Sequence, residues 1–171
     1  LDRIEHEKSI LYVMETPERG VDMKEFLKNH LLTEQEACHF FKQLVKTINT
    51  CLEKDIIHKD IKPENLMLNL DNLQIKLIDF SHGEEAHNSK YRTKPGTCLY
   101  APPEYFENNY YYGESMTVWQ LGVTLFTLLQ GRVPFCNRTE IKKGEYTIIR
   151  KISIDGENLL YKCLNIYPGC R

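Results

Sequence analysis

The segment from Met116 to Gln130 constrains the fold more than any other part of the chain. Its apolar side chains would cover nearly every face of a helix: Met116, Val118, Trp119, Leu121, Val123, Leu125, Phe126, Leu128 and Leu129. A helix that is apolar all round has to be surrounded by other elements in the middle of a core. Gly131 follows as a residue that commonly ends helices. The sequence therefore predicts a fold built around one central helix.

A second long helix is predicted from Thr33 to about Lys54. Thr33 and Glu36 match a capping box, and apolar residues then recur at helical spacing. A short helix is expected around Met23–Asn29. Apolar runs bounded by turn residues predict strands at residues 9–14, 66–68 and 73–78. A few strands with mostly helices indicate an α+β fold with a helical bulk.

Composition and charge exclude several classes of protein. The chain has 171 residues and a net charge of −2, which fits one globular domain and gives no reason to expect nucleic-acid or membrane binding. We expect a monomer. The six cysteines are scattered without a Cys-x-x-Cys pair, which excludes a zinc ribbon or a thioredoxin-like site. They predict reduced thiols in a cytoplasmic or nuclear protein.

The polar loop from His58 to Asn65 has the residues for phosphoryl transfer. Its sequence is His-Lys-Asp-Ile-Lys-Pro-Glu-Asn, between the amphipathic helix and a strand. Asp60 can accept the proton of a hydroxyl, and Lys62 can neutralise a phosphate. Asn65 can offer an oxygen to a hard cation such as Mg²⁺. Asp79 ends the next predicted strand, and its carboxylate can complete a metal site opposite Asn65.

Three motifs in order resemble the signature set of the protein kinases. They are the loop at residues 58–65, then Asp79-Phe80-Ser81, then Ala101-Pro102-Pro103-Glu104. The resemblance covers essentially the whole chain and implies a Ser/Thr kinase, since Lys62 stands two residues after Asp60. It implies a protein-kinase-like α+β fold, chiefly the helical C-terminal lobe, with ATP and Mg²⁺ as the nucleotide and metal.

The subfamily can be narrowed from further residues. The hinge-like run Glu15-Thr16-Pro17-Glu18 resembles that of the Pim kinases, as do residues 111–113 and 118–122, and Thr117 stands where most kinases have Asp. Lys59 replaces the usual Arg, and Ser81 the usual Gly. Lys offers a point charge instead of a bidentate fork, so weak control by phosphorylation is expected.

The resemblance implies individual roles around the catalytic loop. Asp60 resembles the catalytic base and Lys62 the lysine that contacts phosphate. Asn65 and Asp79 resemble the two metal ligands. Thr97 resembles the threonine that bonds both Asp60 and Lys62.

The resemblance also assigns residues to the nucleotide. Met14 resembles the gatekeeper, and Glu15 the hinge residue whose carbonyl contacts adenine. Asp22 and Glu25 lie where the family contacts the ribose or a basic peptide.

Other residues are assigned to the substrate and activation segment. Glu64 lies there, and Glu104 is expected to pair with Arg171. His58 is expected to pack in the core beneath Phe80. The polar stretch at residues 81–98 is long enough to predict a functional or mobile loop.

We expect residues 1–15 to be the last strands of the N-terminal lobe and the start of the hinge. Residues 16–171 are expected to be the C-terminal lobe without its final helix. On this expectation most of the N-terminal lobe, including its Gly-rich loop and lysine, is missing, so this polypeptide alone should bind ATP poorly.

The expected function is transfer of the γ-phosphate of Mg-ATP to Ser/Thr hydroxyls of proteins, with basic sequence contexts as a candidate preference. Intact Asp60, Lys62, Asn65 and Asp79 favour this reading. One alternative is a pseudokinase that keeps the helical lobe as a docking module. Another is a truncated, inactive product with exposed apolar surface.

Overall fold

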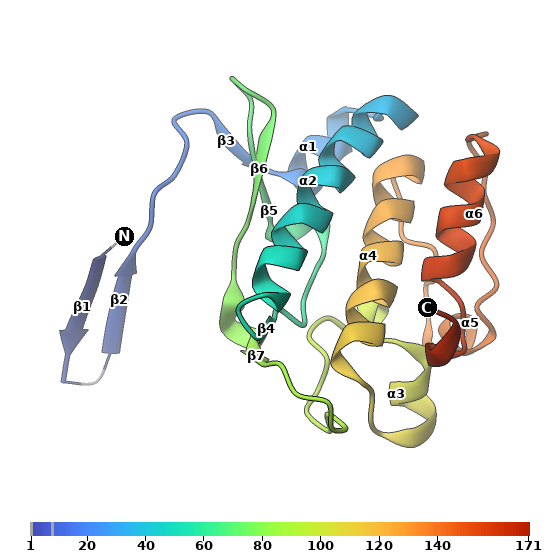
Figure 1. The fold of residues 1–171 in the computed structure, drawn as a ribbon. Helices are drawn as coiled ribbons and strands as arrows, with labels where there is room; N and C mark the ends of the chain where they lie inside the picture. Colours follow the sequence, from blue (N-terminus) through green and yellow to red (C-terminus); the bar gives the residue numbers. More distant parts are fainter. Residues whose placement is uncertain (1, 8) are drawn as a thin grey trace.

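The computed structural model describes residues 2–7 and 9–171. Leu1 and Lys8 belong to the segment expected to form N-terminal strands and lie outside the described residues. Figure 1 shows a body in which long helices lie side by side, with a small sheet along one flank and a β-hairpin that stands apart. The expected α+β fold with a helical bulk is confirmed.

Helix α4 (Gly113–Gln130) forms the centre of the body. Its residues are buried on all faces, and Trp119, Phe126 and Leu128 have no exposed surface. Gly131 ends the helix in the left-handed conformation, with a φ of 71°, a conformation that glycine adopts without steric cost. The predicted central helix is therefore confirmed.

Helices α1 (Met23–Asn29) and α2 (Glu34–Leu52) agree with their predictions. The capping box is complete: the Glu36 N–H donates to Thr33 Oγ1 at 3.2 Å, and the Thr33 N–H donates to Glu36 Oε2 at 2.8 Å. The apolar face of α2 packs on α4 and on strand β6. This packing joins the sheet to the central helix.

A three-stranded antiparallel sheet lies against α2. Its order is β3 (Gly20–Asp22), β5 (Leu66–Asn69) and β6 (Gln74–Leu77), with Leu68 opposite Ile75. The predicted strands at residues 66–68 and 73–78 are confirmed. Strand β3 was not predicted, because three residues that begin with a glycine have no strand pattern of their own.

Several short elements complete the body. Strands β4 (Ile56–Ile57) and β7 (Glu84–Glu85) pair antiparallel, which folds the beginning of the polar stretch at residues 81–98 back onto the body. Helices α3 (Pro103–Asn108), α5 (Arg138–Lys143) and α6 (Ile154–Cys163) had no predicted counterpart. Helix α6 packs closely on α4, where a Cβ at Gly122 would lie 2.7 Å from Cys163 Cβ.

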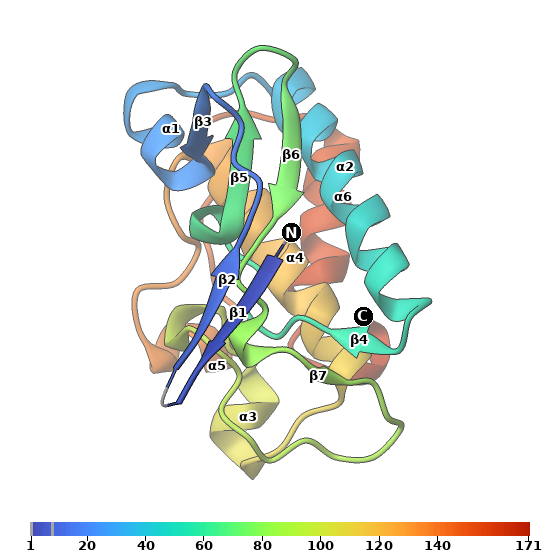
Figure 2. The same ribbon diagram turned by 90° about the vertical axis from the view of Figure 1, so that its left-hand side faces the viewer.

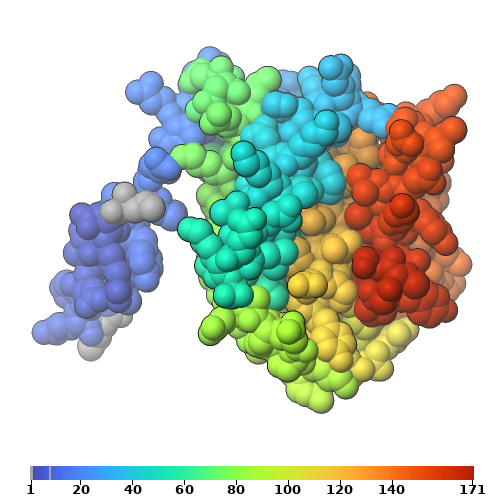
Figure 3. All heavy atoms as spheres, viewed as in Figure 1, coloured from blue at the N-terminus to red at the C-terminus, as the bar shows by residue number. Residues whose placement is uncertain are grey.

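The hairpin of β1 (Asp2–His6) and β2 (Ser9–Val13) differs from the rest of the molecule. The two strands pair only with one another, and all their described residues are exposed. Figures 1 and 3 show the hairpin as a separate projection, joined to the body by an extended segment, and in Figure 2 the hairpin lies in front of the body. The predicted strand at residues 9–14 is confirmed and ends one residue early.

Among the residues that the structure describes, no helix combines the length and apolar character needed to cross a bilayer.

Candidate active site

Asp60 lies at the centre of a hydrogen-bonded cluster on the loop between β4 and β5. Lys62 Nζ lies 2.6 Å from Asp60 Oδ2, and Asn65 Nδ2 lies 3.1 Å from the same oxygen. The Thr97 N–H donates to Asp60 Oδ1 at 2.8 Å, while the Thr97 hydroxyl accepts from Lys62 at 2.7 Å. Three residues from two distant segments, Lys62, Asn65 and Thr97, therefore converge on one carboxylate.

The surroundings of Asp60 keep it ionised. Burial alone would raise the pKa of this carboxyl, but hydrogen bonds from Lys62 and Thr97 outweigh burial and hold the pKa below its usual value. Gly96 makes the close approach of Thr97 feasible, because a Cβ at this position would lie 2.4 Å from Asp60 Oδ1. A carboxylate held in this way can accept a hydrogen bond from a substrate hydroxyl at neutral pH.

Asn65 and Asp79 offer oxygen atoms suited to a divalent cation. Asn65 Nδ2 also donates to the Asp60 backbone carbonyl at 2.8 Å, which fixes the amide and leaves its Oδ1 outside the hydrogen bonds of the described residues. Asp79 is exposed at the end of β6, and hydrogen bonds from Ser81 lower its pKa. Two hard oxygens fit Mg²⁺, which characteristically takes few protein ligands and completes its shell with phosphate and water.

No denser metal-binding group accompanies these two residues. Within residues 2–7 and 9–171, no cluster of three or more His, Cys, Asp or Glu side chains has the arrangement of a metal site.

His58 ties the loop to the end of β6. Its Nδ1 accepts the Asp60 N–H at 3.2 Å, and its Nε2 donates to the Ile78 carbonyl at 3.0 Å. These partners require a neutral imidazole, in agreement with burial lowering its pKa. The expectation that His58 packs in the core beneath Phe80 is confirmed: His58 is 2% exposed, and the Phe80 ring, itself 45% exposed, meets it edge-on at 4.6 Å.

The Lys59 side chain links the loop at residues 58–65 to the polar stretch at residues 81–98. Its ammonium lies 2.5 Å from Glu84 Oε2 and 2.8 Å from Thr93 Oγ1, although its side chain is only 4% exposed. A buried ammonium needs such partners. Glu84 thus provides, within the chain, a negative charge for Lys59, the residue that stands where the kinase motif usually has Arg.

Helix α4 supports the loop through polar side chains that the sequence analysis did not single out. Gln120 accepts the Ile61 N–H at 3.2 Å and donates to the Lys59 carbonyl at 2.8 Å, and Thr124 donates to the Ile61 carbonyl at 3.2 Å. Gln120 is fully buried. The sequence signal for this contact is a glutamine within an otherwise apolar helix, because a buried polar side chain needs hydrogen-bond partners.

Glu104 of α3 and Arg171 lie side by side. Arg171 Nη2 lies 2.7 Å from Glu104 Oε2, both side chains are buried, and the guanidinium lies over the Trp119 ring at 5.3 Å. The sequence expectation that these two residues pair agrees with this geometry.

The residues assigned to the nucleotide do not gather at one point. Met14 is 64% exposed beyond the end of β2. Asp22 caps α1 by accepting the Glu25 N–H at 2.8 Å, and Glu25 pairs with Lys28.

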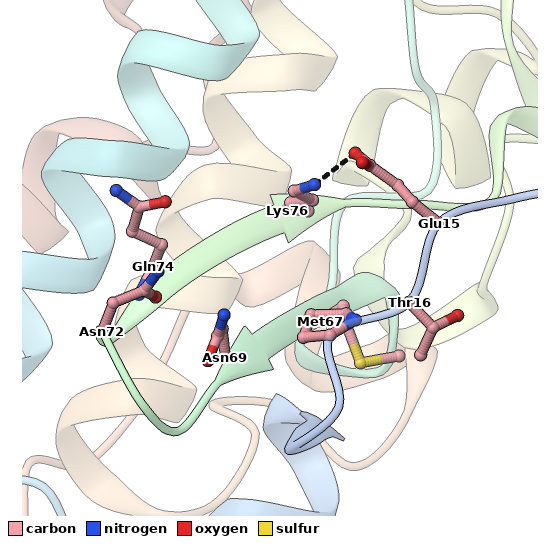
Figure 4. Close-up of a pocket in the computed structure, with 8 residues that line it drawn as sticks. Glu15, Thr16, Met67, Asn69, Asn72, Gln74 and Lys76 are labelled. Atoms are coloured by element: carbon pink, nitrogen blue, oxygen red, sulfur yellow. Dashed lines mark hydrogen bonds and ion pairs between the residues drawn. The ribbon is translucent and has the colours of Figure 1, made fainter.

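Glu15 lies beside a small cavity between the hinge-like segment and the sheet. The Glu15 carboxylate pairs with Lys76 of β6, and the cavity of ≈ 220 Å³ includes Met67 and Gln74 (Figure 4). The catalytic cluster around Asp60 does not line it.

Comparison with known proteins agrees with these motifs. Residues 1–171 match the family model described as protein kinase domain. The chain is 36% identical over 162 residues to serine/threonine-protein kinase pim-2 of Danio rerio, covering 94% of this chain and 52% of that protein. It is 35% identical to serine/threonine-protein kinase prk-2 of Caenorhabditis elegans, covering 94% and 38%.

A third relative is the probable serine/threonine-protein kinase HSL1 of Saccharomyces cerevisiae, at 37% identity over 96% of this chain and 11% of that protein. The chain therefore spans about half or less of the length of these relatives. The predicted kinase resemblance, including its likeness to a Pim kinase, is confirmed. This chain belongs to the protein kinase domain family, and its similar relatives are serine/threonine kinases.

Proposed function

We propose that this protein transfers the γ-phosphate of Mg-ATP to Ser/Thr hydroxyls of protein substrates. The observation that carries the proposal is the convergence of Lys62, Asn65 and Thr97 on the buried Asp60 carboxylate. Phosphoryl transfer asks a protein mainly for positioning and for neutralisation of charge. This cluster offers both within one hydrogen-bonded unit.

Each residue has a defined task in this proposal. ATP would supply the phosphoryl group, and Mg²⁺ bound with it would supply neutralisation of negative charge. Asp60 accepts a hydrogen bond from the acceptor hydroxyl and orients it. Lys62, held by Asp60 and Thr97, presents a cation to the transferred phosphate. Asn65 Oδ1 and the Asp79 carboxylate would hold the metal.

We extend the proposal to the organisation of the protein. Residues 1–15 would belong to the smaller lobe and the start of the hinge, and residues 16–171 to the larger lobe. The free-standing β1–β2 hairpin supports this division, because an isolated two-stranded hairpin is marginally stable at best in water. Met14 and the Glu15 carbonyl would face adenine. The six cysteines are free, which supports a cytoplasmic or nuclear location.

The case for a preference for basic sequences is weakened by pairs within the chain. Glu25 pairs with Lys28, and Glu64 pairs with Lys24 at 2.8 Å. An arginine arriving from a substrate would have to displace a lysine that is already in place.

A docking module without catalysis is the second candidate. The exposure of Met14 and of the apolar residues of β2 favours it, because exposed apolar patches mark surfaces for partners. The complete Asp60 cluster has no role in this reading.

The decisive experiment measures phosphate transfer from labelled Mg-ATP to a pool of Ser/Thr peptides by the full-length protein that contains this chain. Asp60→Asn should lower the rate by about 10²–10⁴-fold, the usual contribution of a positioned base. Asp71→Asn, the same chemical change on an exposed turn, should leave the rate unchanged. A folded full-length protein that transfers no phosphate would overturn the proposal and favour the docking module.

A further inference from the structure

A second cavity opens next to the Asp60 cluster. It has a volume of ≈ 510 Å³ and lies between α1, the turn at Pro63–Asn65, the segment after Thr97 and the end of α4. Thr97 belongs both to its wall and to the cluster, because its N–H and hydroxyl bond to Asp60 and Lys62. Thr97 thus places this cavity directly beside the Asp60 carboxylate.

The wall of this cavity is largely apolar. Leu27 is 9% exposed, and Leu99 and Val133 are half-buried at its sides. Concave apolar surface with a few polar groups at its edge is typical of binding pockets. The shape and lining suit an apolar side chain of a substrate.

The charges around the cavity are unbalanced. Three cations line it, Lys24, Lys28 and Arg132, against the single carboxylate of Glu64. Lys24 is paired with Glu64, and Lys28 is paired with Glu25 from the same helix. Arg132 donates to the Thr147 carbonyl at 2.7 Å and lies over the Phe126 ring at 5.6 Å, and it forms no salt bridge within the part of the chain that the structure describes. A positive charge therefore remains at the rim.

This charge distribution determines which residues a substrate can carry next to an apolar side chain that enters the cavity. A basic residue entering the cavity would meet like charges, which oppose binding, whereas a carboxylate would face Arg132 and the two lysines. Resting on the proposed function, we propose that this groove selects substrate segments in which an apolar residue stands next to an acidic one and discriminates against basic residues. Lys24 and Arg132 are the residues that determine this specificity.

The test uses two matched fluorescent peptides and the full-length protein. They are identical except that Glu or Arg stands beside a leucine close to the serine. Binding is measured by anisotropy with the serine replaced by alanine, and transfer is measured separately with the serine present. The Glu peptide should bind about fivefold more tightly, the upper size expected for an exposed ion pair.

Two variants assign the effect to the cavity. Reversing two charges, Lys24→Glu with Arg132→Glu, should invert the order of the peptides. Lys42→Glu, the same change on the exposed face of α2, should preserve it. Equal binding of the two peptides, or tighter binding of the Arg peptide, would overturn the inference. Preferential binding of the Glu peptide without any transfer would support the groove and contradict the proposed kinase activity instead.

Discussion

The β1–β2 hairpin and the body around α4 use similar apolar side chains with opposite results. In the hairpin, Leu11 is 60% exposed and Tyr12 is 61% exposed, whereas Leu128 and Trp119 of α4 have no exposed surface. Both segments form the secondary structure that their local patterns predict. The difference teaches that a local pattern specifies an element, while burial and its free energy depend on the partners that the chain supplies.

The hydrogen-bonded cluster around Asp60 belongs to the well-packed body. The loop of Asp60 is bonded to the central helix by Gln120 and to the sheet by His58. Preorganised groups of this kind require supports that are themselves fixed. The hairpin, by contrast, leads through an extended segment to the hinge-like residues, where Met14 is exposed.

The largest effect is expected from a truncation in the body. Leu128→Ala should reduce the free energy of unfolding by about 2–5 kcal/mol, because it removes buried methyl groups and leaves a cavity. Urea denaturation followed by circular dichroism measures the change. A loss below about 1 kcal/mol would show that the body repacks around α4 far more readily than cores of this kind do.

The next effect concerns the bond between α4 and the catalytic loop. Gln120→Leu should cost about 2–4 kcal/mol, because it leaves the Ile61 N–H and the Lys59 carbonyl buried without a partner. It should also lower phosphate transfer per folded molecule. Stability is measured in urea, and transfer is measured in the full-length protein at a temperature where both variants are folded.

Gln130→Leu is the matched control. Gln130 is also buried in α4, but it bonds to the backbone of Ile149 and Arg150 and makes no hydrogen bond to the loop at residues 58–65. It should destabilise the protein comparably while sparing transfer per folded molecule. If both variants lose transfer equally, the support from Gln120 is not specific to the loop.

A smaller effect is expected from pH at His58. Burial lowers the pKa of His58 in the folded protein, so the unfolded chain binds its proton first as pH falls below the ordinary value of about 6.5. The contribution of neutral His58 is complete above this pH and is lost below it, with a slope of at most about 1.4 kcal/mol per pH unit. Urea midpoints at several pH values should therefore decline more steeply in the parent than in His58→Gln. Identical slopes would contradict this assignment.

The smallest effect is expected in the hairpin. Leu11→Ala should change the free energy of unfolding of this chain by less than about 0.5 kcal/mol, as exposed substitutions usually do. The same truncation in α4 gives the direct comparison. In the full-length protein the change should become larger if further chain covers β2, and urea denaturation of both proteins distinguishes the two situations.

The sequence by itself determined the elements that have a strong local signal. Helix α2 was predicted from a capping box and a sustained apolar pattern, and helix α4 was predicted from its sustained apolar pattern, because both signals are local. The residues Asp60, Asn65 and Asp79 were found because they belong to short motifs of consecutive residues, which can be recognised in the sequence alone. Short elements such as α3 and β3 were not, since six or three residues have too little pattern to outweigh their turn residues.

Only the tertiary structure decided how distant residues act on the site. Gln120 lies about sixty residues from the backbone groups it bonds, and Lys24 lies 40 residues from Glu64. Such pairs arise from the packing of helices against loops, which a local pattern does not encode. The same packing brings Glu64, which was assigned to the substrate segment, to Lys24 of α1, so that a lysine of the chain itself neutralises this carboxylate.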